Sequence, residues 1–175
     1  MSVYVLFDTE TTGLTLPSTV PLERQPYVIE FGALKYNVSN GKISKLSEFI
    51  KPPIPIPSEA SKINGIFDAD VVNAKSFPKF LPKLHRFFAG VDYCVAHNAE
   101  FDLAVVNHEL ARCCKSFTWP TVRCSMNEFM HLFGYRPSLK LLYYHFTGKE
   151  LRQTHRALDD VEALYKALQL AEFFK

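Results

Sequence analysis

Apolar residues in the first third of the chain follow the short, dense pattern that is typical of strands. Residues 3–7 are almost continuously apolar and indicate a central strand that is buried on both faces and closed by Asp8. Two further apolar runs, 27–36 and 43–50, predict strands that form an antiparallel meander with the first. The segment 51–57 carries four prolines, so it must be extended and separates the meander from the rest of the chain.

Helical spacing of apolar residues dominates the remainder of the chain, interrupted by two short strand-like runs. We expect Ser58 to cap a helical turn and Asn98 to cap a longer helix. The resulting order of elements indicates an α/β fold with a mixed five-stranded sheet, an antiparallel meander plus parallel strands, flanked by helices. The predicted helices are 58–63, 78–89, 101–112, 139–146 and 158–174, and the predicted strands are 93–96 and 121–124.

The composition is that of an ordinary globular protein, since 47% of the 175 residues are hydrophobic and 22% are charged. These values exclude disordered and fibrous proteins, and the length suits one domain that covers residues 1–175. Lys and Arg number 20 against 18 Asp and Glu, a net charge of +2. This balance excludes a protein that coats nucleic acid by charge alone, so a nucleic-acid role requires a local site.

The sequence shows no clear pattern for a membrane span, a signal peptide or a structural metal site. No apolar run approaches the roughly 18 residues of a membrane span, and the first residues lack the basic region of a signal peptide. The four cysteines do not have the spacing of a zinc site. We therefore expect a cytoplasmic protein in a reducing compartment, with no membrane partner.

The triplet Asp8-Thr9-Glu10 is the first candidate for chemistry. Side chains two residues apart in an extended chain point the same way, so Asp8 and Glu10 place two carboxylates side by side. Neighbouring anions repel and need solvent, a shared proton or a cation, and Mg²⁺ and Mn²⁺ prefer carboxylate oxygens. Taken alone, however, the triplet is more typical of a solvated strand end.

Two later segments also place acids at the starts of expected helices. Asp102 lies in a first helical turn, where it either stabilises the positive helix end or binds a ligand. In the last helix, Asp160 lies about 60° from the centre of the apolar face and Asp159 about 160° away. Asp160 therefore borders the core and requires a metal or a cationic partner, whereas Asp159 is solvated. His155 lies in the loop before this helix, and an imidazole suits a general base near neutral pH.

Four carboxylates from three distant segments, together with one histidine, meet the requirement for two-metal hydrolysis of a phosphodiester. In this order, three segments resemble the motifs of the DEDDh, or DnaQ-like, 3′–5′ exonucleases. That family includes the proofreading epsilon subunit of bacterial DNA polymerase III, ribonuclease T and oligoribonuclease. The histidine five residues before Asp160 marks the DEDDh branch. The segments are Phe7-Asp8-Thr9-Glu10-Thr11-Thr12-Gly13-Leu14, His97-Asn98-Ala99-Glu100-Phe101-Asp102 and His155-Arg156-Ala157-Leu158-Asp159-Asp160.

The resemblance implies a ribonuclease-H-like fold and the release of nucleoside 5′-monophosphates from the 3′ end of single-stranded DNA or RNA. It implies two Mg²⁺ ions, for which Mn²⁺ substitutes, and His155 as the general base. It assigns the ligands of these metals as Asp8, Glu10, Asp102 and Asp160. It also implies contacts to the last nucleotides by Thr11, Leu14, Ile63, Asn64, Asn98 and Phe101, although Asn64 stands where many members have a histidine.

The expected partners are single-stranded or 3′-frayed DNA or RNA, with a DNA polymerase and a second copy of the chain as further candidates. One alternative is a non-catalytic binding or polymerase-accessory module of the same fold. It is disfavoured because a degenerate copy would have lost an acid or the histidine. A second alternative is an endonuclease of the wider fold, against which the spacing of His155 and Asp160 argues.

Basic residues outside the motifs form two loose series. The first is more typical of solvated helix faces than of a track for the upstream strand. In the second, Arg152 and Arg156 either hold a phosphate or pair with Asp159. The first series comprises Lys51, Lys62, Lys75, Lys79, Lys83 and Arg86, and the second comprises Arg136, Lys140, Lys149, Arg152 and Arg156.

Overall fold

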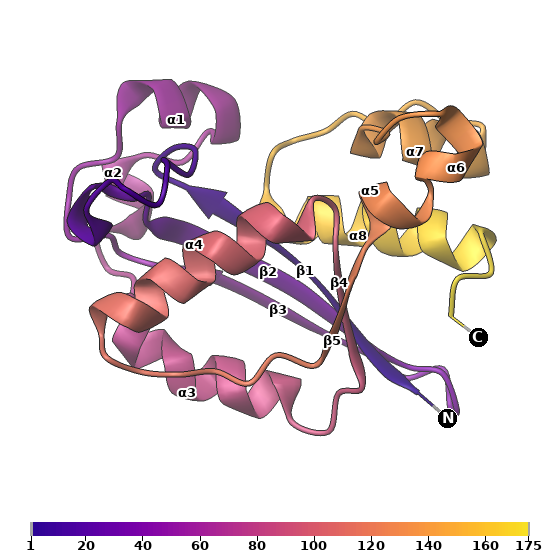
Figure 1. Ribbon diagram of the computed structural model, residues 1–175, viewed down its shortest axis with the longest axis horizontal. Coiled ribbons are helices and arrows are strands. Elements are labelled where there is room, and N and C mark those ends of the chain that lie inside the picture. Colours follow the sequence, from indigo (N-terminus) through magenta and orange to yellow (C-terminus); the bar gives the residue numbers. More distant parts are fainter. Residues whose placement is uncertain (1, 175) are drawn as a thin grey trace.

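The computed structural model describes residues 2–174, which form a five-stranded sheet with helices on both faces (Figure 1). The strands lie in the order β3-β2-β1-β4-β5. The pairs β1–β2 and β2–β3 are antiparallel, whereas β1–β4 and β4–β5 are parallel, so the predicted mixed sheet is confirmed. The bounds are Val3–Thr11 for β1, Val28–Asn37 for β2, Ile43–Phe49 for β3, Tyr93–Ala96 for β4 and Thr121–Cys124 for β5.

The helices include four short ones that the sequence did not predict, because elements of three or four residues carry no periodic pattern. Ser58 is the first residue of its helix and follows the cap position Pro57, so the expected Ser58 cap is wrong. The long helices are α1 Ser58–Asn64, α3 Phe77–Phe88, α4 Ala99–Arg112, α7 Leu139–Thr147 and α8 Ala157–Leu170. The short ones are the 3-10 turn η1 Leu22–Arg24, α2 Asp68–Val71, α5 Ser125–Glu128 and α6 Met130–Phe133.

The last helix is shorter than predicted. It ends at Leu170, and the chain then turns so that the rings of Phe173 and Phe174 pack against Tyr4. The aromatic residues therefore continue the apolar pattern of α8 without continuing the helix, which explains why periodicity alone placed its end at 174.

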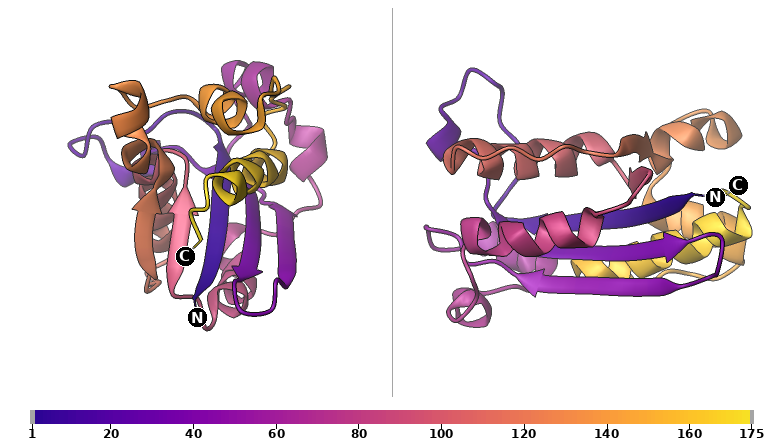
Figure 2. Two further views of the ribbon diagram at one scale, coloured as in Figure 1. Left: turned by 90° about the vertical axis from the view of Figure 1, so that its right-hand side faces the viewer. Right: turned by 90° about the horizontal axis from the view of Figure 1, so that it is seen from below.

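Alternation along β1 divides the core between the two faces of the sheet. Val5 and Phe7 pack with residues of α3 and α4, whereas Tyr4 and Leu6 pack with residues of α7 and α8. Figure 2 shows the sheet between α4 on one side and α8 on the other. Burying both faces in this way requires the nearly continuous apolar run that the sequence shows.

The first strand is longer than the sequence suggested. It does not close at Asp8 but continues to Thr11, because pairing with β2 persists with Asp8 opposite Gly32 and Glu10 opposite Glu30. An irregularity of register follows Glu10. Asp8 and Glu10 therefore lie inside the strand, on the face that α8 covers.

A glycine lets α8 approach the sheet next to these acids. A β-carbon at Gly32 would lie 2.4 Å from the carbonyl carbon of Ala157 and 2.4 Å from the nitrogen of Leu158. Both contacts are with backbone, which cannot rotate away as a side chain can. The first turn of α8 therefore rests directly on β2, beside Asp8.

Among the described residues, no helix combines the length and the apolar character needed to cross a membrane. The four cysteines are free thiols, as the sequence led us to expect, with Cys94 buried and Cys114 exposed. The cytoplasmic location stays a prediction.

Replacing Gly32 by alanine should force α8 away from the sheet. We expect the free energy of unfolding to fall by about 1–3 kcal/mol, the usual cost of overpacking a core. Urea unfolding followed by circular dichroism measures this. Gly13→Ala is the matched control, because a β-carbon at Gly13 meets nothing within 4 Å. An unfolding midpoint of Gly32→Ala equal to that of Gly13→Ala would contradict the role given to this contact.

Candidate active site

Three of the residues singled out in the sequence meet at the end of the sheet. Ligand atoms of Glu10, His155 and Asp160 all lie within 4.8 Å of one another. Glu10 comes from β1, His155 from the loop before α8, and Asp160 from the first turn of α8. Within residues 2–174, this is the one group of three or more such side chains close enough to share a metal ion.

Asp8 and Asp102 adjoin this group from two sides. Asp8 precedes Glu10 by two residues on the same face of β1, whereas Asp102 lies in the first turn of α4. The Oδ1 atom of Asp102 accepts hydrogen bonds from the backbone nitrogen of Thr9 at 2.9 Å and from its hydroxyl at 2.7 Å. These bonds hold Asp102, which is only 2% exposed, against β1.

The electrostatics of the site are those of crowded anions. The pKa of Glu10 is raised to about 8, first by burial and then by the charges of Asp160 and Glu30. Burial likewise raises the pKa of Asp102 to about 7, although the two bonds from Thr9 oppose the rise. The pKa of Asp8 lies well above its ordinary value, first through burial and then through the charges of Asp102 and Glu10.

Burial also raises the pKa of Asp160, while a hydrogen bond from Gln153 and the charge of His155 oppose the rise. A buried set of mutually repelling carboxylates is stabilised by divalent cations, whose hard charge suits oxygen ligands. Asp8, Glu10, Asp102 and Asp160 therefore fit a divalent-metal centre.

The loop before α8 contributes two features to the site. His155 has a φ of 53°, in the left-handed region that residues with a β-carbon rarely adopt. Gln153 Nε2 donates to Oδ2 of Asp160 at 2.7 Å. Sequence reasoning missed both Gln153 and Thr9, because neither residue type signals a contact to an acid that is close only in space.

Helical geometry correctly separated the two neighbouring aspartates. Asp160 is 6% exposed, whereas Asp159 is exposed and accepts a hydrogen bond from the Thr154 hydroxyl. The expected pairing of Arg156 with Asp159 is not found. Arg156 instead bonds to Glu30 of β2, which lies 126 residues away and could not be identified from local spacing.

The loop after β1 and helix α1 each carry one exposed apolar side chain. Leu14 is 80% exposed and Ile63 is 64% exposed. The two segments are linked, because Asn64 Nδ2 donates to the backbone oxygen of Thr11 at 3.4 Å. Asn64 is buried, and the Thr11 hydroxyl donates to the Gly13 carbonyl at 2.7 Å. Thr11 and Asn64 thus shape the backbone that carries Leu14.

Asn98 and Phe101 lie at the start of α4. Asn98 occupies the cap position with a φ of 77°, but its side chain makes no capping bond, so that part of the prediction is wrong. Its Oδ1 accepts from Arg136 Nη2 at 3.0 Å instead. Phe101 is partly buried against the core. Nδ1 of His97 bonds to the Ser125 hydroxyl at 2.8 Å, so this histidine has a structural partner.

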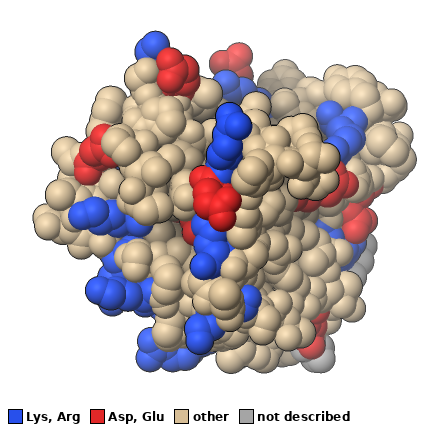
Figure 3. Space-filling view, turned by 60° about the vertical axis from the view of Figure 1, so that its left-hand side comes forward, with Lys and Arg blue, Asp and Glu red and all other residues tan. Residues whose placement is uncertain are grey.

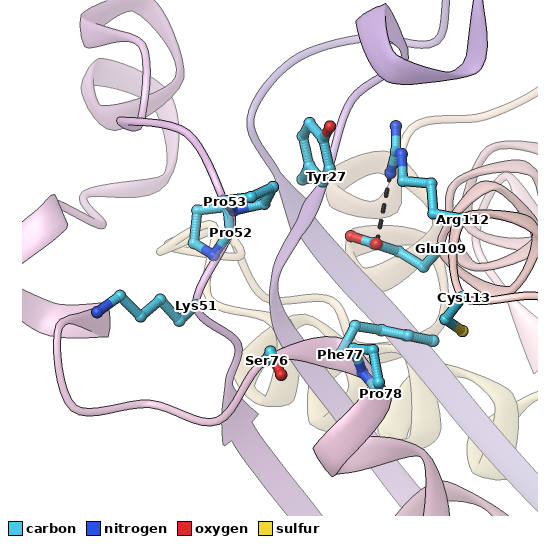
Figure 4. Close-up of a pocket in the computed structure, with 10 residues that line it drawn as sticks. All are labelled: Tyr27, Lys51, Pro52, Pro53, Ser76, Phe77, Pro78, Glu109, Arg112 and Cys113. Atoms are coloured by element: carbon cyan, nitrogen blue, oxygen red, sulfur yellow. Dashed lines mark ion pairs between the residues drawn. The ribbon is translucent and has the colours of Figure 1, made fainter.

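A separate pocket of about 400 Å³ lies at the far end of α4, and none of the five candidate catalytic residues lines it (Figure 4). Its polar groups are already partnered. The Arg112 guanidinium lies 3.7 Å from the centre of the Tyr27 ring and pairs with Glu109, which also accepts from the nitrogen of Val28. Arg112 donates as well to the carbonyls of Leu22, Gln25 and Pro26. These contacts hold the loop before β2 against α4, so the charged residues that line the pocket have a structural role.

The basic side chains on the face shown in Figure 3 do not mark out one continuous track for a nucleic-acid strand. Figure 3 shows Lys and Arg gathered in the lower left part of one face, with acids more frequent elsewhere on it. Two members of the first basic series already have partners, because Lys83 pairs with Glu48 and Lys51 Nζ donates to the Val72 carbonyl at 3.1 Å. These contacts agree with the interpretation of ordinary solvated faces.

The raised pKa values predict how the stability of the metal-free protein depends on pH. Glu10 favours folding when it is protonated, so its contribution is complete below its ordinary pKa of 4.5 and is lost as the pH rises towards about 8. The melting temperature without divalent ions should therefore fall between about pH 5 and about pH 9, and Mg²⁺ should raise it most at the alkaline end. Differential scanning fluorimetry measures both effects.

Glu10→Gln should weaken this pH dependence, whereas Glu59→Gln, which changes an exposed acid, should leave it unchanged. Identical pH profiles for the wild type and Glu10→Gln would contradict the electrostatic description of the site.

Known proteins resemble this chain over most of its length. A family model described as Exonuclease matches residues 5–168. The chain is 34% identical over 161 residues to a DNA polymerase III subunit epsilon of Treponema pallidum (strain Nichols), covering 90% of this chain and 70% of that protein. It is 35% identical over 164 residues to a DNA polymerase III PolC-type of Caldanaerobacter subterraneus, covering 91% of this chain but only 11% of that protein.

Solved structures share the fold. Exonuclease X in complex with 5′ overhanging duplex DNA has a TM-score of 0.68 and 24% identity, over 97% of this chain and 93% of that chain. The nuclease domain of 3′hExo, described as a DEDDh family member bound to rAMP, has a TM-score of 0.78 and 15% identity, over 99% and 93%. The family model and the epsilon relative show that this chain belongs to the exonuclease family, and the DEDDh member among the solved structures shares its fold.

Proposed function

We propose that this enzyme releases nucleoside 5′-monophosphates from the 3′ end of single-stranded DNA or RNA by a two-metal mechanism. The observation that carries the proposal is the grouping of Glu10, His155 and Asp160 within 4.8 Å, with Asp8 and Asp102 beside them. A general base next to metal-ligating acids is the arrangement that phosphodiester hydrolysis requires.

The four acids Asp8, Glu10, Asp102 and Asp160 hold two Mg²⁺ ions in this proposal, with Mn²⁺ as a substitute. When bound, the ions supply Lewis-acid polarisation of the scissile phosphate and lower the pKa of the attacking water. Thr9 fixes Asp102 through two hydrogen bonds, and Gln153 fixes Asp160 through one, so these ligands are oriented before substrate binds. Such preorganisation reduces the cost of reorganisation during the reaction.

His155 takes the proton of the attacking water through a ring nitrogen. The water oxygen forms a bond to phosphorus, while the bond between phosphorus and the 3′ oxygen of the penultimate nucleotide breaks. That 3′ oxygen takes up a proton, so the products are a nucleoside 5′-monophosphate and a strand shortened by one residue with a free 3′ hydroxyl. His155 is placed for this step by the loop that leads directly into Asp160.

The terminal nucleotide lies against Leu14 and Ile63 in this proposal. Both are large apolar side chains that are exposed to solvent, and their exposure supports a contact with a base. Thr11 and Asn64 act through the backbone that carries Leu14, whereas Asn98 and Phe101 border the start of α4 and lie near the next nucleotide.

Relatives named DNA polymerase III subunit epsilon and DNA polymerase III PolC-type support association with a DNA polymerase. We propose the cytoplasm as the location of this activity. A homodimer is a second candidate assembly. The non-catalytic alternative is disfavoured, because all four acids and the histidine are present and converge on one place.

One assay tests the activity and its direction together. Purified protein with Mg²⁺ should release labelled mononucleotide at once from 3′-labelled single strands of DNA or RNA, and shorten 5′-labelled strands stepwise. Asp8→Asn should abolish release while the circular dichroism spectrum stays that of a folded protein, because it removes one metal-ligand charge from the site. Endonucleolytic fragments, or full activity of Asp8→Asn, would overturn the proposal.

His155→Ala tests the general base separately from the metal site. The rate of the chemical step should fall by about 10²–10⁴, the usual contribution of a general base, with a smaller change in Mg²⁺ affinity. Single-turnover kinetics and calorimetry measure the two quantities. His131→Ala, which removes an exposed histidine, is the matched control. A rate for His155→Ala within twofold of the control would exclude the role.

A further inference from the structure

A fifth carboxylate lies directly beside the proposed metal ligands. Glu30 of β2 is paired in register with Glu10 of β1, so the two side chains share one face of the sheet. Glu30 is 2% exposed, and its charge contributes to the raised pKa values of Asp8 and Glu10. The position of Glu30 and its carboxylate oxygens would allow it to compete with the proposed ligands for the metal ion. Its hydrogen-bond partners decide whether it does.

Both oxygens of Glu30 are already occupied by donors. Arg156 Nη2 donates to Oε1 at 2.8 Å, and Arg156 Nε donates to Oε2 at 3.0 Å. The backbone nitrogen of Ala157 also donates to Oε2, at 3.1 Å. A buried carboxylate with this two-point arginine pairing is neutralised and oriented, and both of its oxygens are engaged by donors.

The same arginine stands between the two functional residues of the third motif. His155 immediately precedes it, and the backbone nitrogen of Asp160 donates to its carbonyl oxygen at 3.0 Å. Its guanidinium also lies 4.9 Å from the centre of the Phe49 ring of β3. Arg156 is therefore anchored to β2 and β3 through its side chain, while its backbone carries the left-handed His155 on one side and the first turn of α8 on the other.

We propose that Glu30 and Arg156 form a positioning pair for the active site. The pair fixes the turn from His155 to Asp160 against the sheet, and it keeps the Glu30 carboxylate out of the metal centre. This inference rests on the proposed function, because it assigns the geometry of the same site. Neither residue touches the reacting atoms, so both are positioning residues and not catalytic ones.

A second ion pair also joins α8 to the sheet, and it serves as a comparison for the first. Lys45 of β3 pairs with Glu162 of α8 at 2.8 Å, and the side chains are 49% and 43% exposed. Glu162 lies two residues beyond Asp160, so both pairs join the start of α8 to the sheet, one through β2 and the other through β3. Lys45→Met therefore removes a contact between α8 and the sheet without altering the first turn, and it is the matched control.

The test compares Arg156→Met, Arg156→Lys, the double variant Glu30→Gln/Arg156→Met and Lys45→Met. Three quantities are measured on each at a temperature where all are folded: the melting temperature, kcat and KM on a single-stranded oligonucleotide, and the affinity of the substrate-free protein for Mn²⁺ by calorimetry. Arg156→Met should lower kcat and Mn²⁺ affinity by about 10- to 100-fold, the usual cost of losing a residue that orients metal ligands, with KM little changed. Arg156→Lys should be intermediate, because lysine keeps the charge but loses the two-point pairing.

The double variant separates positioning from stability. Glu30→Gln removes the buried charge that Arg156→Met leaves unpaired, so it should recover the lost melting temperature but only the part of kcat that was lost to Glu30 entering the metal centre. Lys45→Met should leave kcat and Mn²⁺ affinity unchanged. A folded Arg156→Met with kcat within twofold of the wild type would overturn the inference, as would full recovery of kcat in the double variant, because the turn from His155 to Asp160 would then not need the pair. An inactive wild type would refute the proposed function instead, and the Mn²⁺ affinities would still decide whether the pair positions the ligands.

Discussion

The first turn of α8 lies directly on the backbone of β2 at Gly32, where no side chain separates the two elements. Gly32 is paired with Asp8, so this contact brings the start of α8 to the strand that carries the first two acids. Asp160 is part of that turn, and His155 lies in the loop that leads into it. The distances of the site therefore depend on a close approach that only glycine permits.

The site brings together groups that repel one another. Asp8, Glu10 and Asp102 all have raised pKa values, first because they are buried, and the charges of neighbouring carboxylates add to the rise at Asp8 and Glu10. Apolar contacts on both faces of the sheet supply the opposing stabilisation, since one core packs under α3 and α4 and another under α7 and α8. Divalent cations relieve the repulsion, so metal binding and folding stability are coupled.

Buried and partly buried acids in this protein fall into two groups according to their contacts. Glu30 and Glu109 each accept from a backbone nitrogen and pair with an arginine, and they tie segments of the chain together. Glu10 and Asp160 instead face each other and His155. This difference in bonding separates structural carboxylates from functional ones more clearly than burial does, because members of both groups are almost fully buried.

Sequence and tertiary structure determined different parts of this protein. Alternation along β1 and the 100° step of α8 were sufficient to place Asp8 and Glu10 on one face and to separate Asp160 from Asp159, because both patterns are local. The three motifs were likewise readable in the sequence. The length of β1, the partner of Arg156 and the contacts of Thr9 and Gln153 were not, because each depends on groups that packing brings together. Spacing can show which side chains share a face of one element, but only the packed chain decides which face meets another.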